Sequence, residues 1–445
     1  MPIQGKAVMN RGNQKGSANR GARASTARAL IVLMRWLAGS VLVLAGATVA
    51  CAADVSIEAE YLPGAQTQGE NGFRNITRPA GFCAADPGGC AGVTTVDLPV
   101  GDVSYGALDS GANGQDGVYL RAPANPIRVE LRDERTNRVT AVTFRVAGMI
   151  GQYTLRPDVY QLTGTPAGSA ETAHAALWNG GSWLQPPAGC TALSVQPMAT
   201  ANAYRFGWRL PRDGGGCFKT PRQSLPAGAV VLDGSSLAVA YELVTPDPVS
   251  LPNGTYQGVH TFTVGPGKDF DFGAHGHVAR SSVDVAFVLK VRHKFMITDS
   301  GAGNDVKLAP AQGWLNWIAE GKPLTRIERD VMYGLSTGEP LRVSLRCEDG
   351  EDAAGRCVMR NPHGSVVPVD LSLTVVGATT DRKAPFSRIP LTTRAPASLD
   401  VDRYLDNAVA TAHVAIDGEG VSEMGQHPGT TYTGRASVVF DAIAD

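Results

Sequence analysis

Apolar and polar residues alternate along many short stretches of this chain. Clear examples are 55–61 (VSIEAEY), 127–131 (IRVEL), 282–291 (SVDVAFVLKV) and 366–376 (VVPVDLSLTVV). A period of two puts alternate side chains on opposite faces of a strand, so these stretches predict β-strands. Long helical periods are few, and 314–318 (WLNWI) is compatible with either a short helix or a strand.

Turn-forming residues separate the predicted strands. The chain of 445 residues contains 52 glycines and 28 prolines, and strands recur roughly every ten residues, the spacing of β-sandwiches. The sequence therefore predicts an all-β protein.

The first 53 residues differ in kind from the rest. They contain seven basic residues and no acidic one, and the apolar run 36–49 leads into Ala50-Cys51-Ala52. This order is typical of a secretory signal, and the run is too short for a stable membrane span. We therefore expect 1–53 to be a cleaved leader, for which Met34 is an alternative start.

A proline-rich stretch, 245–250 (TPDPVS), divides the rest of the chain. Proline fixes φ and has no N–H donor, so this stretch predicts a short, stiff linker. An alternating run follows at 255–264, as at the start of a new β-domain. The predicted domains are 54–244 and 251–445.

Cysteine content and charge narrow the class of protein. Without the leader, 33 basic and 41 acidic residues remain, a net charge of −8, which does not favour nucleic-acid binding. An even number of cysteines in an exported chain favours disulfides, and fifteen pairings are possible. Pairing of nearest neighbours is the simplest, and free thiols are the alternative: Cys83 with Cys90, Cys190 with Cys217, and Cys347 with Cys357.

Two motifs carry a resemblance to a known family. The sequence TYQGVHTFTVGPGKDFDFG at 255–273 and the closing YTGRASVVFDA at 432–442 resemble the pilin domain of the minor tip subunits of class 5 (alternate-chaperone) fimbriae, the CfaE/CblD-like family. The first half matches this family in size and position only. The resemblance implies two immunoglobulin-like sandwiches in tandem, an adhesin domain followed by a pilin domain that lacks its last strand.

An incomplete sandwich needs a partner strand. In the resembled family a periplasmic chaperone first covers the groove, an outer-membrane usher assembles the fibre, and the major pilin subunit then donates a strand. The last predicted strand, 431–440, is expected to form one wall of the groove. The alternative is a complete sandwich in which it is merely the last strand. The expected wall residues are apolar: Tyr432, Ala436, Val438 and Phe440.

The resemblance also implies that the first half binds host glycans through basic residues. The planar fork of arginine suits a sugar carboxylate or several hydroxyls. The alternative is that these are solvated charges of strands and loops. The candidate residues are Arg212, Lys219 and Arg222, with Arg74 and Arg78 beside them. Four aromatic residues are candidates either for stacking on a sugar or for the core: Trp178, Trp183, Tyr204 and Trp208.

Other chemistry has little support in the sequence. His275 and His277 lack a third metal ligand, and the Asp- and Gly-rich turns do not have the spacing of a calcium-binding EF-hand. No motif for a nucleophile, a metalloprotease or a phosphate loop occurs. We therefore expect no enzyme activity and no cofactor.

The expected function is that of an adhesin at the tip of a bacterial fimbria, exported through the periplasm. A non-adhesive initiator of fimbrial assembly remains an alternative. A secreted glycan-active enzyme on a β-sandwich is an alternative of another class, and it would need a pair of carboxylates facing a cleft.

Overall fold

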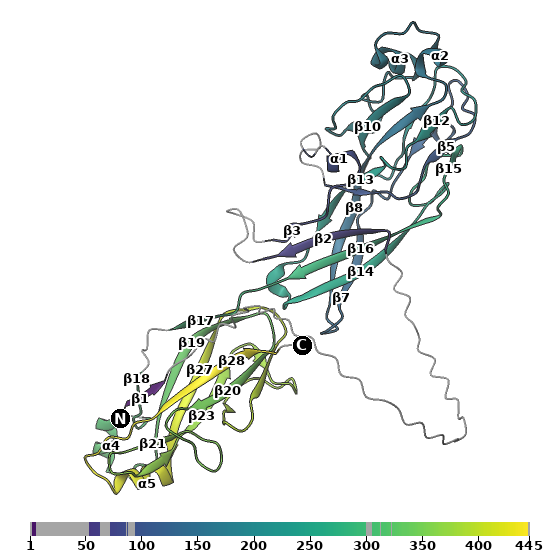
Figure 1. Cartoon of the computed structure of the whole chain (residues 1–445). Helices are drawn as coiled ribbons and strands as arrows, with labels where there is room; N and C mark the ends of the chain where they lie inside the picture. The colour runs from purple at the N-terminus through teal and green to yellow at the C-terminus, as the bar shows by residue number, and fades with distance from the viewer. Residues whose placement is uncertain are drawn as a thin grey trace, which may run out of the picture.

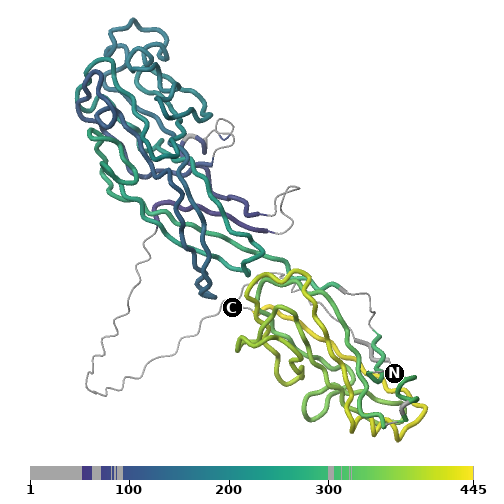
Figure 2. Tube along the Cα trace, turned by 180° about the vertical axis from the view of Figure 1, so that it is seen from behind, coloured from purple at the N-terminus to yellow at the C-terminus, as the bar shows by residue number. Residues whose placement is uncertain are grey.

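The computed structural model describes residues 53–62, 72–85, 87, 94–299, 305–311, 313–321 and 323–443, and the backbone of 2–5. They form two lobes that lie end to end (Figure 1), and Figure 2 shows the same arrangement from behind. Lobe 1 comprises residues 53–291 and lobe 2 comprises residues 296–443. Each lobe buries its own apolar core. The predicted all-β class is confirmed.

Lobe 1 is built on a sheet of thirteen strands, with a two-stranded ribbon beside it. The long strand β8 runs through its centre and has partners along both edges. The strands are β2 (Val55–Tyr61), β3 (Arg74–Asn75), β4 (Thr95–Asp97), β5 (Val103–Tyr105), β6 (Val118–Leu120), β7 (Ile127–Asp133), β8 (Val139–Leu155), β9 (Thr191–Ala192), β10 (Ala203–Arg209), β11 (Cys217–Lys219), β12 (Val230–Leu232), β13 (Ala238–Val244), β14 (Gly254–Thr263), β15 (Gly276–His277) and β16 (Ser282–Val291). The helices are α1 (Phe82–Ala85), η2 (Gly114–Asp116), α2 (Val159–Thr163), α3 (Ala170–Leu177) and η3 (Pro248–Ser250).

The chain does not leave lobe 1 at the proline-rich stretch, so the predicted boundary at 245–250 is wrong. Residues 248–250 form the turn η3, capped by Asp247, whose side chain accepts a hydrogen bond from the Val249 N–H. The chain then returns to the same sheet, where β14 pairs with β7 and β16 pairs with β2. Proline interrupts a strand here without ending the sheet, and lobe 2 begins only after Val291.

Lobe 1 also contains the helices α2 and α3, which the alternating pattern did not predict. Helix signals are nevertheless present in the sequence. The Asp158 side chain accepts a hydrogen bond from Gln161 N, and that of Ser169 accepts one from Thr172 N. Both are N-cap residues of the preferred types.

Lobe 2 has two facing sheets. Its elements are β17 (Met296–Asp299), β18 (Asp305–Lys307), α4 (Trp314–Glu320), β19 (Arg326–Thr337), β20 (Leu341–Cys347), β21 (Val358–Arg360), β22 (Val366–Pro368), β23 (Asp370–Val375), β24 (Ala378–Thr379), β25 (Ile389–Pro390), β26 (Ala397–Val401), β27 (Leu405–Asp417), α5 (Gly418–Gly425) and β28 (Arg435–Ala442). One sheet has the order β17-β19-β27-β23-β25. The other has the order β18-β1-β28-β20-β26-β24 and includes β1 (Pro2–Gly5).

These orders match an immunoglobulin sandwich up to its sixth strand. In that fold strands A, B, E and D form one sheet, and C, F and G form the other. Here β17, β19, β27 and β23 follow the A-B-E-D order, while β28 and β20 take the places of F and C. The place of strand G lies between β28 and β18, where the backbone of β1 is found.

Candidate functional site

Among the residues that the structure describes, the outer edge of β28 has a partner strand along only a short part of its length. β20 pairs with this strand from Ala436 to Ala442 on one side. On the other side β1 reaches only Arg435 and Ala436. From Ser437 onward, that edge pairs with no strand in the part of the chain that the structure describes. Unpaired backbone groups at such an edge are a template for another strand.

The apolar side chains beside this open edge are incompletely covered. Ala436, Val438 and Phe440 pack against the core of lobe 2 but stay half-buried. Across from them, Val331 and Tyr333 of β19 are also half-buried against the core. We call these five residues and the open edge of β28 the lobe 2 groove.

Tyr333 is the polar member of the lobe 2 groove. Its ring lies 6.2 Å from that of Phe440, edge to face. Its hydroxyl is buried without a hydrogen-bond partner among the described residues, and burial raises the pKa of this phenol well above its usual value. A strand entering the groove would meet an apolar surface with one hydroxyl to satisfy.

Tyr432, predicted to line the groove, lies instead in the core. It is fully buried, and its hydroxyl lies 2.8 Å from Ser365 Oγ. The reason is its position before the start of β28, where the chain bridges Arg360 through Thr433 and has not yet reached the edge.

In lobe 1, Arg212 belongs to an arginine cluster on the sheet surface. Arg145 makes two hydrogen bonds to the Glu242 carboxylate. Arg209 Nη1 and Arg212 Nη2 lie 4.0 and 3.9 Å from the same carboxylate. Bonding to Arg145 lowers the pKa of Glu242. The three guanidinium groups and this one carboxylate together carry two net positive charges.

The three arginines differ in how they are held. Arg145 is almost buried, whereas the Arg212 side chain is 80% exposed. Strand β8 therefore fixes the base of the cluster, while Arg212 extends into solvent after β10 ends. The sequence indicated Arg212 but gave no signal for Arg145, because only the register of β8 with β13 and β10 brings these side chains together.

Lys219 cannot serve as an exposed receptor contact, so this prediction is wrong. The residue is 2% exposed, and its ammonium donates to the carbonyl oxygens of Gly180, Gly181 and Ser182 at 3.1–3.4 Å. Burial lowers the pKa of Lys219 to about 8. The alternating pattern of β11 explains this, since Lys219 lies on the same face as the buried Cys217.

The other predicted basic residues are exposed but lie on separate elements. Arg222 donates from Nε to the carbonyl of Trp178. Arg74 lies on the short strand β3 and pairs with Glu60, and Arg78 follows in the loop after it. No contact found among the described residues joins these three to the arginine cluster.

The four candidate aromatics form a buried cluster. Trp178, Trp183, Tyr204 and Trp208 are all 0–1% exposed. The Trp183 and Trp208 rings stack with centroids 4.7 Å apart. The cluster belongs to the core of lobe 1 and offers no face to a sugar.

Two disulfides join neighbouring cysteines in the described residues, Cys190–Cys217 in lobe 1 and Cys347–Cys357 in lobe 2. Cys83 is also disulfide-bonded. Its expected partner, Cys90, lies outside the described residues, so this third pairing stays a prediction.

Within the described ranges, no group of three or more His, Cys, Asp or Glu side chains is placed to hold a metal ion. No described helix has the length and apolar character to cross a membrane. The carboxylate of Asp271, from one of the acidic turns, accepts hydrogen bonds from the backbone N–H groups of Gly267 and Gly273, as a turn residue does.

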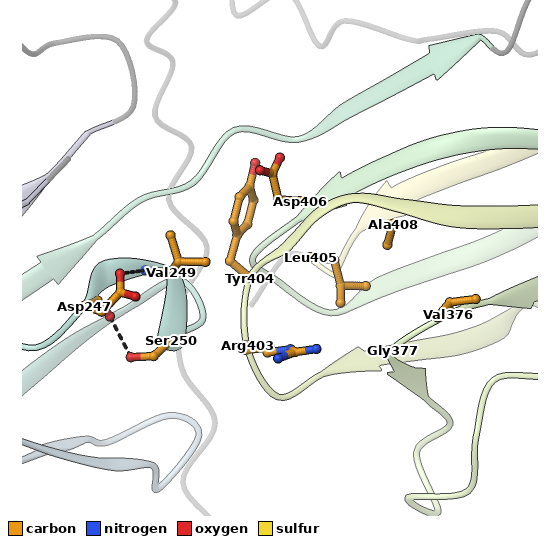
Figure 3. Close-up of a pocket in the computed structure, with 10 residues that line it drawn as sticks. All are labelled: Asp247, Val249, Ser250, Val376, Gly377, Arg403, Tyr404, Leu405, Asp406 and Ala408. Atoms are coloured by element: carbon orange, nitrogen blue, oxygen red, sulfur yellow. Dashed lines mark hydrogen bonds between the residues drawn. The ribbon is translucent and has the colours of Figure 1, made fainter. Parts of the chain in front are cut away.

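A cleft of about 500 Å³ lies where the lobes meet. Figure 3 shows Asp247, Val249 and Ser250 of lobe 1 facing the loop of Tyr404 and Leu405 in lobe 2. The Tyr404 ring stacks on His293 with centroids 4.0 Å apart. This stacking and the polar contacts around it mark the cleft as part of the joint between the lobes.

Gly338 is required at this joint. Its carbonyl accepts a hydrogen bond of 2.6 Å from Asn253 N. A Cβ at this position would lie 2.5 Å from Asn253 Oδ1 and 2.8 Å from the His293 ring. The end of lobe 2 that carries Gly338 is therefore the end in contact with lobe 1.

No protein-family model and no curated protein matches this chain. Solved structures with some similarity include three that contain fimbrial tip proteins. CfaE, the adhesive subunit of CFA/I fimbria of enterotoxigenic Escherichia coli, is 8% identical, with 78% of this chain and 89% of that chain covered and a TM-score of 0.21. A chaperone–tip adhesin complex of CFA/I fimbriae biogenesis is 9% identical, with 77% and 85% covered and a TM-score of 0.27. The CsuC–CsuE chaperone–tip subunit complex of Acinetobacter baumannii is 11% identical, with 88% and 100% covered and a TM-score of 0.22.

Such identities and scores are too low to transfer a function. The proposals that follow therefore rest on the geometry of this chain.

Proposed function

We propose that this protein is an exported fimbrial tip adhesin, in which lobe 2 accepts a donor strand from the next pilin subunit and lobe 1 binds a host glycoconjugate. The observation that carries the proposal is the open edge of β28 beside half-buried apolar side chains. An added strand would pair its backbone with this edge and cover Val438 and Phe440, which is how β-strand addition gains affinity.

The position of β1 supports the same proposal. This strand lies between β18 and β28 and pairs with both. It comes from the leader that the sequence predicts to be removed on export. Cleavage would leave the position between the two strands for another chain, first a periplasmic chaperone and then a major pilin subunit delivered at the outer-membrane usher.

Two features of lobe 1 fit the proposal that it is a receptor-binding domain at the tip. Its strand β2, the first of the mature chain described here, is built into the sheet beside β16 and is not free to act as a donor. A subunit that accepts a strand but keeps its own first strand fits the distal end of a fibre. The lobe 1 arginine cluster is the surface that we assign to acidic sugars, because its excess positive charge suits a carboxylate or sulfate.

The strand-accepting part is tested by peptide binding to residues 54–445. The probe is a labelled N-terminal peptide of the mature major pilin encoded beside this gene. The unaltered protein should retain the peptide through gel filtration, and Val438→Asp should lose it because a charge would enter the lobe 2 groove. Val409→Asp, an exposed position in the other sheet of lobe 2, is the matched control and should retain it. Failure of the unaltered protein to bind would overturn this part.

The receptor-binding part is tested by red-cell agglutination with beads coated with the strand-complemented protein. Arg212→Glu should abolish agglutination, and removal of sialic acid from the cells should have the same effect. Arg329→Glu, an exposed charge reversal on β19 of lobe 2, should have none. Agglutination that survives Arg212→Glu would move the receptor site elsewhere. No agglutination by the unaltered protein would favour a non-adhesive assembly initiator.

A further inference from the structure

The helix α4 presents an exposed apolar stripe. Leu315 is 84% exposed, Ile318 66% and Trp314 45%. With about 100° between successive residues of a helix, these three side chains fall on one side. Scattered apolar residues are ordinary on a protein surface, but a contiguous stripe marks an interaction site.

A ring contact with Trp317 fixes the position of Trp314 in the stripe. Trp317, next to Trp314 around the helix, is half-buried, and its ring meets that of Trp314 edge to face at 5.8 Å. Tryptophan anchors of this kind carry much of the binding energy in protein interfaces.

The helix lies at the end of lobe 2 that points away from lobe 1 (Figure 1). It follows β18, the strand across from the open edge of β28. Between the two, Ala309 bridges Glu328 near the start of β19. Lobe 1 contacts the opposite end, through Gly338 just beyond the end of β19.

This placement limits where a strand-donating partner can lie. The last residues of β28 run toward lobe 1, since Ile443 N donates to Pro340 O close to Gly338. A donor strand parallel to β28 would lead its own folded domain into lobe 1. An antiparallel strand would leave the lobe 2 groove at the other end, beside α4.

We propose that the exposed stripe of α4 (Trp314, Leu315 and Ile318) docks onto the folded body of the pilin subunit whose strand fills the lobe 2 groove. This inference rests on the proposed function. The partner surface is apolar, because the three exposed side chains of the stripe carry no charge. The contact would fix the angle between the tip protein and the next subunit, which a strand alone leaves free.

The test compares a peptide with a whole subunit. The first probe is the N-terminal peptide of the neighbouring major pilin. The second is that pilin whole, with its own groove filled by a fused copy of the same segment. The variant is Leu315→Gln with Ile318→Gln, which keeps helix-forming residues at exposed positions. Both probes are titrated against residues 54–445.

The double variant should bind the peptide within about twofold of the unaltered protein and the whole subunit about tenfold or more weakly, as expected for loss of an interface anchor. Val409→Gln, exposed in the same lobe but outside the stripe, should leave both affinities unchanged. Equal affinity of the double variant and the unaltered protein for the whole subunit would overturn the proposal while leaving strand acceptance intact. If neither probe binds the unaltered protein, strand acceptance itself fails.

Discussion

In lobe 1 the central strand β8 has partners along both edges, whereas in lobe 2 the described residues give the strand β28 a full partner along one edge only. The side chains follow the same difference. Trp183 and Trp208 are completely buried in lobe 1, while Val438 and Phe440 stay half-buried in lobe 2. A sheet that completes itself gives a stable platform, and one that leaves an edge open requires a partner.

The largest expected loss of stability is in lobe 1, whose central strand has partners along both edges. Trp208→Ala removes a fully buried ring that stacks on Trp183, which should destabilise lobe 1 by about 3–5 kcal/mol. Chemical denaturation of residues 54–445 should show a lower midpoint for lobe 1 and an unchanged one for lobe 2. A shift of both midpoints would mean that the lobes unfold as one unit.

The disulfide of lobe 1 should stabilise its lobe more than the disulfide of lobe 2 does, because it closes a longer loop. Cys190–Cys217 spans 27 residues and Cys347–Cys357 spans 10. Loop-closure entropy predicts losses of about 3–4 and about 2–3 kcal/mol when each pair is replaced by serine. Denaturation of the two double-serine proteins measures this, and a larger loss for the shorter loop would contradict it.

The buried ammonium of Lys219 makes the stability of lobe 1 depend on pH. Its folded pKa is about 8, below the ordinary 10.5, so the unfolded chain binds more protons between these values. Stability should therefore rise as pH increases from about 8 to about 10.5. The change is measured as the difference from Lys219→Met, which cannot titrate. If the difference in stability between the two proteins does not change with pH over this range, Lys219 keeps its ordinary pKa in the folded protein.

The smallest expected loss of stability comes from a change beside the open edge of β28. Val438→Ala removes a half-buried side chain, which should cost less than about 1 kcal/mol in the protein without a donor strand. The same change should weaken donor-peptide binding several-fold, because the added strand covers this side chain. A large loss of stability without the peptide would indicate that the lobe 2 groove is already closed.

Alternation in the sequence predicted most strands, because a half-buried strand needs a period of two. The strands at 55–61, 127–131 and 282–291 all form where expected. The domain boundary could not be predicted in this way. The prolines near 246–248 mark a turn whether the next strand joins the old sheet or starts a new one, and only pairing across the sheet decides between these.

The candidate sites show the same limit. Ala436, Val438 and Phe440 follow from the alternation of one strand, and the structure puts all three against the lobe 2 core. The arginine cluster depends on strands far apart in sequence, so Arg145 gave no local signal. Lys219 is the opposite case. In the sequence it is an isolated lysine in a loop-rich segment, which predicts exposure, and only its position on β11 shows that it is buried.

The most direct test of strand acceptance by lobe 2 is calorimetry of residues 54–445 with and without the N-terminal peptide of the neighbouring major pilin. Lobe 1 and lobe 2 should give separate transitions. The peptide should raise the midpoint of the lobe 2 transition and leave that of lobe 1 unchanged, since a ligand stabilises only the part that binds it. A lobe 2 transition that is high from the start and indifferent to the peptide would contradict the account, because it would mean that lobe 2 is a complete sandwich.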